Sequence, residues 1–220
     1  MMNLAKYPSH INQHLVVLKS GNDQWKARSL EKGENVVSAQ RFKKIYCIKE
    51  GIVMCFAFSD DGKSIVKNLF YPGDYFGEEA LQALATNENQ YHVLSNKAVV
   101  EEISVYEFQN IVRENPQFFI SFFQQVMERN QRMEKIMERN LSLKAEQRVQ
   151  SVLKELILKA GKKMLNGEYV LRQNLQHQEM ATIANTTRQM VSSLLNLWRT
   201  KGQLTYDRSQ IIIRNPQFLI

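Results

Sequence analysis

Apolar residues recur with helical spacing in the segment QHQEMATIANTTRQMVSSLLNLWRTKG at residues 176–202. Met180, Ile183 and Ala184 would share one face of a short helix, because residues three or four apart lie on the same side. Asn185 follows them, and Asn accepts the left-handed backbone conformation more readily than most residues. The pattern therefore predicts a short helix that ends in a tight turn.

A second amphipathic helix follows the turn, and either Thr186 or Thr187 can cap its N-terminus. Its apolar stripe would consist of Met190, Val191, Leu194, Leu195 and Trp198, and its polar faces of Arg188, Gln189, Ser192, Ser193 and Asn196. A turn-bounded hairpin comes next. This order is typical of a winged helix-turn-helix, whose second helix enters the major groove of DNA. The alternative is an ordinary amphipathic helix pair in a protein core.

The pattern is different in the N-terminal half. A short helix is expected at residues 9–20. From about Trp25 to Ser104, short apolar runs such as IYCIKEG, IVMCFAF and IVKNLFYPGD are broken by Gly, Asp and Asn. The Asp-Asp-Gly sequence at residues 60–62, between two such runs, is a hairpin signal. Short strands at this spacing favour an antiparallel sandwich or barrel over a parallel sheet.

The stretch PGDYFGEEAL at residues 72–81 combines glycine turns with the start of a helix. A Pro-Gly turn comes first, and Gly77 lets backbone amides approach a ligand closely. Glu78 and Glu79 would begin a short helical segment. The inner side of this segment would carry Ala80, Leu81 and Leu84. A glycine turn that opens a helix can bind an anion, because free backbone amides converge there.

Residues from Pro116 to about Asn140 have the pattern of one long helix. The seam of a two-stranded coiled coil would contain Phe119, Phe123, Val126, Asn130, Met133, Met137 and Asn140, flanked by Glu128, Arg129, Arg132, Glu134, Lys135, Glu138 and Arg139. Asn130 in such a seam lowers stability but fixes register and pairing. We therefore favour a homodimer; the alternative is packing of this stripe on the protein's own sheet. The upstream residues Phe118, Phe119, Phe122 and Phe123 would serve both contacts.

Charge is distributed unevenly along the 220 residues. Residues 1–140 carry 17 Lys and Arg against 17 Asp and Glu, whereas residues 141–220 carry 12 against 5, so the net charge of +7 resides at the C-terminal end. This asymmetry indicates a polyanionic partner for that end; the alternative is a solubilising excess of lysine. Hydrophobic residues make up 44% of the chain, which supports a packed core. No apolar run approaches the ~20 residues of a membrane span.

Several classes of site are not supported by the sequence. The N-terminus lacks the apolar core of a secretion signal. Cys47 and Cys55 lie in apolar strand-like runs, as expected of buried reduced thiols in a cytoplasmic protein; the alternative is a redox switch. Two thiols are too few for an iron–sulfur cluster, and the four histidines lack metal-ligand spacing. P-loop, GxSxG and HExxH motifs are missing, so we expect no enzyme, no catalytic residues and no metal.

These parts, in this order, resemble the Crp/Fnr superfamily of bacterial transcription regulators, the relatives of the catabolite activator protein. The resemblance runs from about Leu30 to Ile213 and rests on Gly33, Gly51 and Gly73, the FGE at residues 76–78, the EEIS before a helix at Val105–Glu114, QRVQSVLKEL at Gln147–Leu156, and HQEMA and TTRQMVSSLLNLWRTKG near the C-terminus. It implies an α+β fold. An antiparallel β-roll or jelly roll of the cyclic-nucleotide-binding type would occupy residues 1–115, a long dimerisation helix 116–141, and a winged helix-turn-helix domain 142–220.

The resemblance also implies the DNA contacts. Arg188 matches the family arginine that grips a guanine, and a bidentate Arg–guanine contact is the commonest specific one. Gln189 stands where many members have Glu, which would shift base preference from cytosine towards adenine. Ser193 stands where relatives often carry a second Arg, so one base or phosphate contact would be missing. The other DNA-binding candidates are Gln178, Thr187, Ser192, Lys201 and Arg208, with Arg199 and Ser209 as plausible backbone contacts. For the basic residues and the wing, solvated charge is the alternative.

The effector site departs from the family pattern. In family members that bind cyclic AMP, the Gly-Glu of this anion-binding turn is followed about ten residues later by an Arg-Ser. Gly77 and Glu78 are present, but no Lys or Arg lies between Glu78 and Lys97, and Glu88, Asn89 and Gln90 fill the approximate place. Met133-Glu134 replaces the Thr-Ser that meets the base. The candidate pocket residues are Phe76, Gly77, Glu78, Glu79, Asn89, Gln90 and Met133; filling by Phe70, Tyr91, Leu94 or Met133 would make the pocket structural.

We therefore interpret the chain as a cytoplasmic, homodimeric, sequence-specific DNA-binding transcription regulator. It would bind a near-palindromic site in double-stranded DNA, contact RNA polymerase as a further partner, and have no membrane association. We expect no cofactor, and an effector that is either an unidentified small molecule or none, not a cyclic nucleotide. One alternative is a cyclic-AMP-responsive activator. The other is a ligand-binding regulatory protein whose basic domain docks another protein.

Overall fold

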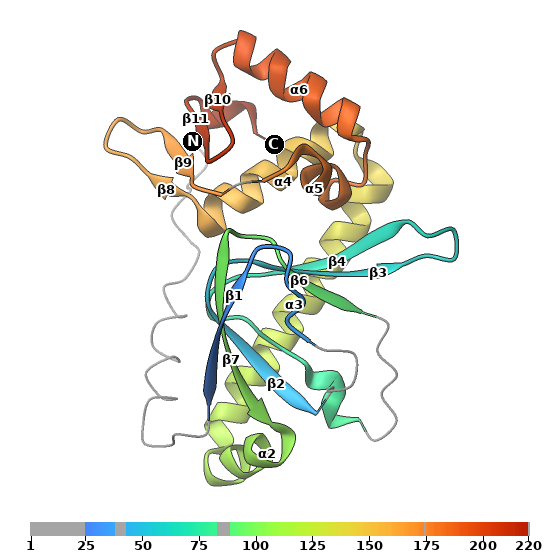
Figure 1. Cartoon of the computed structure of the whole chain (residues 1–220), viewed down its shortest axis with the longest axis vertical. Helices are drawn as coiled ribbons and strands as arrows, with labels where there is room; N and C mark the ends of the chain where they lie inside the picture. The colour runs from blue at the N-terminus through green and yellow to red at the C-terminus, as the bar shows by residue number, and fades with distance from the viewer. Residues whose placement is uncertain (1–24, 38–42, 83–88, 174, 220) are drawn as a thin grey trace.

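The computed structural model describes residues 25–37, 43–82, 89–173 and 175–219. The helix expected at residues 9–20 lies outside this part of the chain. Figure 1 shows a strand-rich N-terminal half, a long helix α3 that runs along it, and a C-terminal half at the upper end. The N-terminal strands are β1 (Lys26–Glu31), β2 (Lys44–Glu50), β3 (Val53–Phe58), β4 (Ser64–Phe70), β5 (Tyr75–Phe76), β6 (Gln90–Val93) and β7 (Lys97–Ser104).

Two antiparallel sheets make up the N-terminal half, which we call the β-roll. Their strand orders are β1-β7-β2-β5 and β4-β3-β6. The cluster between them includes Tyr46, Ile48, Val53, Cys55, Phe70, Phe76, Tyr91, Val93 and Val100. The predicted hairpin joins β3 to β4, and Gly62 in its turn has a φ of 77°, a conformation that favours glycine. The predicted antiparallel sheet architecture is therefore confirmed.

Both cysteines are buried in the β-roll and are free thiols, as expected. Burial raises the pKa of Cys47 and of Cys55 to about 12. Both thiols therefore stay protonated at neutral pH. Protonated, buried thiols are poor nucleophiles.

Two helices cover one face of the first sheet. They are α2 (Val105–Glu114) and α3 (Pro116–Ser142), and the cluster beneath them contains Ile45, Cys47, Tyr75, Ile103, Phe108, Phe118 and Phe122. Helix α2 begins with a capping box in which Ser104 and Glu107 bond each other's backbone amides. Asn115 caps α3, and Pro116 occupies its first turn, where a missing N–H costs nothing.

Helix α3 has two distinct faces. On the outer face Phe119, Phe123 and Met137 of the predicted seam are exposed, as is Asn130. Of the other seam positions, Val126, Met133 and Asn140 are half-buried. The predicted flanks need a correction, because Arg129 and Arg139 are buried on the inner face. The heptad pattern marks the apolar stripe, but it does not show that arginines on the opposite side bind the protein's own polar groups.

The C-terminal half consists of α4 (Ala145–Ala160), β8 (Lys162–Lys163), β9 (Tyr169–Leu171), α5 (His177–Ile183), α6 (Arg188–Thr200), β10 (Leu204–Tyr206), β11 (Ile211–Ile213) and a 3₁₀ turn, η2 (Pro216–Phe218). Its strands form one antiparallel sheet in the order β10-β11-β9-β8. Its core includes Val149, Leu153, Leu156, Met180, Val191, Leu195 and Trp198. This core continues into the β-roll, since Phe56, Leu69 and Tyr71 belong to the same cluster.

The segment after Gly77 is helical, as predicted, but it is a 3₁₀ turn, η1 (Glu78–Leu81), with no buried residue. Leu81, expected on the inner side, is 40% exposed, because so short a turn does not bury a full face. Leu84 lies outside the described residues. Among the residues that the structure describes, no helix has the length and apolar character that crossing a membrane requires. Within the same ranges, no three His, Cys, Asp or Glu side chains gather as a metal site would need.

Candidate nucleic-acid interface

The turn between α5 and α6 is held in the geometry that its sequence predicts. Asn185 is the described non-glycine residue with a positive φ, at 47°. Arg148 of α4 donates hydrogen bonds to the carbonyl oxygens of Ala184 (Nε, 2.9 Å) and Asn185 (Nη2, 2.8 Å). Thr187, one of the two candidate capping residues, caps α6, because its Oγ1 accepts a hydrogen bond of 3.1 Å from the amide of Met190. The two helices are therefore joined rigidly.

Helix α6 presents a polar face to solvent. Its buried side chains are Val191, Leu194, Leu195 and Trp198. Met190, predicted in this stripe, is 41% exposed because it lies about 100° around the helix from Val191. The exposed face carries Arg188, Gln189, Ser193 and Asn196. Figure 1 shows α6 along the outer edge of the molecule, on the side away from the β-roll.

Ser192 is engaged within the domain. Its hydroxyl lies 2.8 Å from Nδ1 of His177, the first residue of α5. Burial, and secondarily the charge of Arg188, lower the pKa of His177, so its imidazole is neutral at pH 7. The predicted role of Ser192 as a direct DNA contact therefore competes with this bond. His177 was not predicted as part of this interface, because a pair separated by 15 residues leaves no local pattern in the sequence.

The β10–β11 hairpin is the wing of the winged helix-turn-helix, and Tyr206 on β10 joins it to α6. The hydroxyl of Tyr206 on β10 donates to Oδ1 of Asn196 at 3.1 Å. The guanidinium carbon of Arg199 lies 5.4 Å from the centroid of the Tyr206 ring, within cation–π range. Ring centroids of Tyr206 and His177 are 5.6 Å apart. Tyr206 thus connects both helices to the β10–β11 hairpin.

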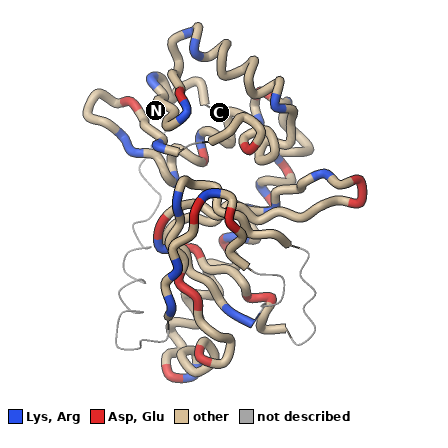
Figure 2. Tube along the Cα trace, in the orientation of Figure 1, with Lys and Arg blue, Asp and Glu red and all other residues tan. Residues whose placement is uncertain are grey.

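The basic candidates outside α6 are exposed. Lys201 follows the helix directly, and Arg208 lies in the turn of the β10–β11 hairpin. Asp207 holds this turn by accepting from the amides of Ser209 (2.7 Å) and Gln210 (3.0 Å), and it also binds the Ser209 hydroxyl. Gln178, near the start of α5, is exposed as well. Figure 2 shows Lys and Arg recurring along the C-terminal half.

The predicted anion-binding turn at Gly77 and Glu78, which we call the cradle, holds an ion pair of the protein's own side chains. Gly77 has a φ of 93°, and a Cβ there would lie 2.6 Å from the carbonyl oxygen of Lys44. Glu78 forms a bidentate ion pair with Arg129 of α3, in which Nη1 lies 2.9 Å from Oε2. Nη1 also lies 3.4 Å from the carbonyl oxygen of Tyr75. The sequence did not identify Arg129 as a residue of this site.

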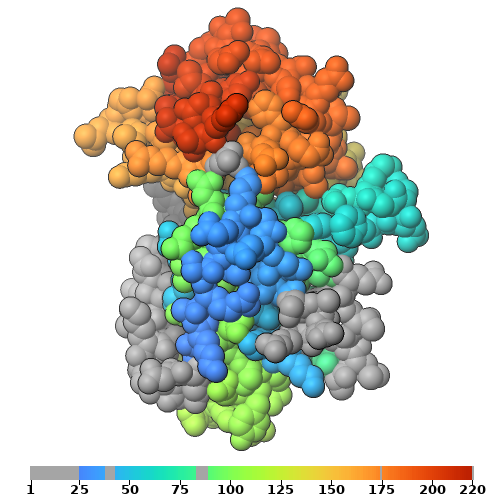
Figure 3. Space-filling model, viewed as in Figure 1, coloured from blue at the N-terminus to red at the C-terminus, as the bar shows by residue number. Residues whose placement is uncertain are grey.

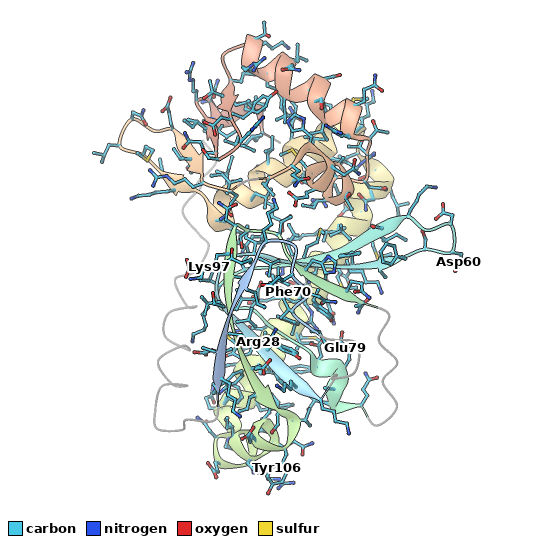
Figure 4. All side chains as sticks on the ribbon, viewed as in Figure 1. Arg28, Asp60, Phe70, Glu79, Lys97 and Tyr106 are labelled. Carbon is cyan, nitrogen blue, oxygen red and sulfur yellow. The ribbon has the colours of Figure 1, made fainter. Side chains whose placement is uncertain are left out.

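Aromatic rings pack together beside the cradle, beginning with Phe76, the residue before Gly77. Phe76 stacks on Tyr91 with centroids 4.9 Å apart and tilts against Phe70 at 4.8 Å. The Tyr91 hydroxyl donates to Oε1 of Glu79 at 3.0 Å. Phe70 lies at the centre of the β-roll, and Glu79 extends from η1 (Figure 4). Leu94, named as a possible filler, packs instead in the cluster shared with the C-terminal half.

The remaining candidate pocket residues are polar or half-buried. Asn89 Oδ1 accepts from Lys67 Nζ at 2.8 Å, and Gln90 Oε1 accepts from Asn35 at 3.2 Å. Met133 is half-buried on α3, and Glu88 lies outside the described residues. Arg129, the cation at the cradle itself, is already paired with a carboxylate.

Comparison with known proteins agrees with this geometry. Residues 147–220 match the family of Crp-like helix-turn-helix domains. No curated protein sequence matches the chain significantly. Among solved structures, FixK2 from Bradyrhizobium japonicum matches with a TM-score of 0.75 at 18% identity, over 89% of this chain and 95% of that one. A variant of CooA from Carboxydothermus hydrogenoformans gives a TM-score of 0.71 at 21% identity, over 93% of each chain.

A third structure is a cyclic nucleotide-binding domain containing protein from Listeria monocytogenes, with a TM-score of 0.72 at 18% identity over 96% of this chain and 99% of that one. Likeness at these identities shows the fold, whereas the match at residues 147–220 is made by the sequence. The chain therefore has the fold of the Crp/Fnr family of transcription regulators and carries a Crp-like helix-turn-helix domain.

Proposed function

We propose that this protein is a cytoplasmic transcription regulator that binds a near-palindromic DNA site as a homodimer. The observation that carries the proposal is the exposed polar face of α6, with Arg188 and Gln189 at its start. This face belongs to a Crp-like helix-turn-helix domain, and residues 141–220 hold the whole net charge of +7. A positively charged, exposed recognition helix suits the major groove of a polyanionic duplex.

The outer face of α3 supports the homodimer. Its exposed apolar side chains are Phe119, Ile120, Phe123, Met127, Met137 and Leu141. A stripe of this length on a single helix is costly to leave in water. A second copy of the same helix would cover it, with Asn130 setting the register. Two protomers would then place their recognition helices on half-sites ~34 Å apart.

The DNA-binding candidates other than Ser192, whose hydroxyl lies 2.8 Å from Nδ1 of His177, have the following proposed roles. Arg188 would read a guanine, and Gln189 would favour an adenine. Gln178, Lys201 and Arg208 would contact phosphates and fix the position of the domain on the duplex. Thr187 caps α6 with its side chain, which leaves its hydroxyl one further bond to give. Ser193 would contribute a hydroxyl where relatives often place an arginine.

The effector of such a regulator would not be a cyclic nucleotide. A cyclic phosphate needs a buried cation, and the charge of Arg129 is used by Glu78. Phe76, the residue before Gly77, is also stacked on Tyr91. These contacts support an effector-independent protein or one that responds to a different small molecule. A cyclic-AMP-responsive activator is the second candidate, favoured by the fold shared with a cyclic nucleotide-binding domain containing protein.

The direct test is duplex binding at several salt concentrations. A preferred sequence would first be selected from random duplexes with the full-length protein. A DNA-binding dimer should then show a plot of log K against log salt with a slope of about −5 or steeper, because each neutralised phosphate releases counterions. Failure to select any sequence, or a salt-insensitive interaction, would sink the proposal and favour a basic domain that docks protein.

A further inference from the structure

Arg139 is a buried cation with no part in the DNA face or the cradle. It lies on the inner face of α3, and its side chain is 7% exposed. Nη1 is 3.7 Å from Oε2 of Glu155 on α4, and Nη2 donates to the carbonyl oxygen of Ile183 at 3.3 Å. Ile183 is the last residue of α5. Arg139 thus connects the long helix to the end of the first helix of the helix-turn-helix.

Glu155 extends this contact into the β-roll. Its Oε1 accepts a hydrogen bond of 3.1 Å from the hydroxyl of Tyr71, a residue that is 3% exposed and follows β4. The amide of Tyr71 donates to Asp74 at 2.9 Å, and Asp74 forms two 3.1 Å bonds with Arg132 of α3. The hydrogen bonds and ion pairs therefore run without interruption from the β-roll, through α4, to the helix-turn-helix.

The surroundings of this network are apolar. Leu69, Leu94 and Leu153 belong to the cluster that the β-roll and the C-terminal half share. Figure 3 shows the C-terminal residues, coloured orange to red, resting directly on the strands below. Burial raises the pKa of Tyr71, with further increases from the charge and the hydrogen bond of Glu155, so the phenol stays protonated and donates. Tyr71 and Arg139, the buried members of the network, tolerate few alternative geometries in such surroundings.

The other end of α5 is held as well. Lys32 of the β-roll lies 2.8 Å from Oε2 of Glu179, and the same oxygen accepts from the amide of Gln176 at the N-terminus of α5. Helix α5 is therefore fixed at its first turn by the β-roll and at its last residue by Arg139. Its orientation sets the orientation of α6, because Arg148 and Asn185 hold the turn between them.

We propose that Tyr71, Glu155 and Arg139 form an interdomain latch, which fixes the orientation of the recognition helix α6 relative to the long helix α3. Arg139 and Tyr71 are positioning residues, since neither touches the exposed face of α6. Two half-sites can be bound together only if both recognition helices keep a fixed separation and angle, so the latch favours binding by preorganisation. The link to DNA affinity rests on the proposed function, whereas the fixed orientation does not.

The test compares Tyr71→Phe with the matched control Tyr106→Phe in the full-length protein. Tyr71→Phe keeps the ring and removes the bond to Glu155, while Tyr106 lies on α2 and is 70% exposed. Affinity would be measured for a selected duplex with two half-sites and for one with a single half-site. We expect Tyr71→Phe to bind the full site roughly tenfold more weakly, to bind the single half-site like the wild type, and to tolerate altered spacing.

Equal losses on both duplexes would indicate a damaged helix-turn-helix and would overturn the latch. Unchanged binding to the full site would also overturn the latch. Tighter binding to the full site would overturn the claim that the latch favours DNA binding, because the orientation that it fixes would then be unproductive. Glu155→Gln provides a second variant, which keeps an acceptor for Tyr71 but removes the charge opposite Arg139. It should show the same pattern. Thermal unfolding of each variant checks that the domains are folded.

A distance measurement separates the latch from the proposed function. Spin labels would be placed at Gln109→Cys on α2 and Leu165→Cys in the β8–β9 hairpin, both at exposed positions. The native thiols Cys47 and Cys55 are buried and do not compete for the label. Labelled chains diluted with unlabelled ones should give one narrow distance, broadened by Tyr71→Phe and unaffected by Tyr106→Phe. An equally narrow distance in Tyr71→Phe would refute the latch, even if the wild type bound no DNA.

Discussion

Arg188 and Arg129 show that the surroundings of an arginine determine which groups its guanidinium can bind. Arg188 is exposed at the start of α6, where its planar fork of donors is free for a base edge. Arg129 is buried against Glu78, so its charge is balanced inside the protein. Under the proposed function, the same side chain would read a base at one position, whereas it neutralises a carboxylate at the other.

Replacing Arg188 with Ala should remove one base contact. We expect Arg188→Ala to cost about 1–3 kcal/mol on the preferred site and to relax the preference at one guanine. Lys201→Ala, by contrast, should weaken binding to all duplexes alike, because a phosphate contact carries no sequence information. Competition binding against single-base variants of the site would measure both. An unchanged sequence preference in Arg188→Ala would place the recognition helix elsewhere.

Cyclic AMP should fail to bind at the cradle. Titration calorimetry with cyclic AMP and cyclic GMP is expected to show no saturation below about 1 mM, because a buried phosphate without its own cation loses several kcal/mol. Arg129 is unavailable while it pairs with Glu78. Micromolar binding of either nucleotide would contradict this account of the site and restore the cyclic-AMP-responsive alternative.

Single residues were predictable where local chemistry determines them. Asn185 adopts the left-handed conformation that its place in the turn demands, and Thr187 caps α6. The pairs His177–Ser192 and Arg129–Glu78 were not predictable, since they join residues 15 and 51 positions apart. Such pairs depend on tertiary packing and leave no periodic pattern in the sequence.

Among the elements, α3 combines an apolar outer face with an inner face on which buried apolar residues alternate with buried arginines. Phe118 and Phe122 pack on the β-roll, whereas Phe119 and Phe123 are exposed. The helical period accounts for this division, because residues one position apart point about 100° away from each other. Sequence periodicity located the outer stripe but could not show which side the β-roll covers, because both sides carry phenylalanines.

Phe123→Glu should separate the two protomers. A carboxylate in an apolar helix seam is desolvated without a partner, so the variant is expected to sediment as a single chain. The affinity of Phe123→Glu for a site with two half-sites should also fall, because a single chain binds only one half-site at a time. Leu165→Glu is the matched control, because Leu165 is fully exposed in the β8–β9 hairpin and lies outside the α3 stripe. A dimeric Phe123→Glu protein would show that the α3 stripe is not the interface.

A charged cluster links the strands of the first sheet and gives a pH test. Glu102 on β7 binds Arg28 of β1 and Lys44 of β2. Burial raises the pKa of Glu102, but its hydrogen bonds to Lys44 and Arg28 lower it by more, so the folded pKa lies below the ordinary value. The stabilisation is therefore present at neutral pH and is lost as pH falls through the folded pKa.

Glu102→Gln should remove this pH dependence. At pH 7 the variant is expected to lose about 2 kcal/mol of unfolding free energy, because hydrogen bonds to charged groups are the stronger ones. The difference between wild type and variant should begin to shrink at pH ~4.3, where an unfolded glutamate binds its proton, and should vanish only below the lower folded pKa. Denaturant unfolding across this pH range measures the difference, and a constant gap down to pH 3 would contradict the assignment.

At the scale of the whole molecule, two halves share one apolar cluster and one polar network. The order of β-roll, long helix and winged domain was predictable, because strand-like runs, a 27-residue helix and a helix–turn–helix each have their own sequence period. Their mutual arrangement was not, since it depends on contacts such as Tyr71–Glu155 across 84 residues.

Sedimentation of the full-length protein with a selected duplex tests the central claim, a two-fold pair that holds two recognition helices on one DNA site. At micromolar concentration we expect two chains without DNA and a complex of two chains per duplex. Raising the salt should release the DNA while leaving the pair of chains intact, because counterions compete for the phosphates and not for the apolar stripe of α3. A single chain at micromolar concentration, with and without the duplex, would contradict the account.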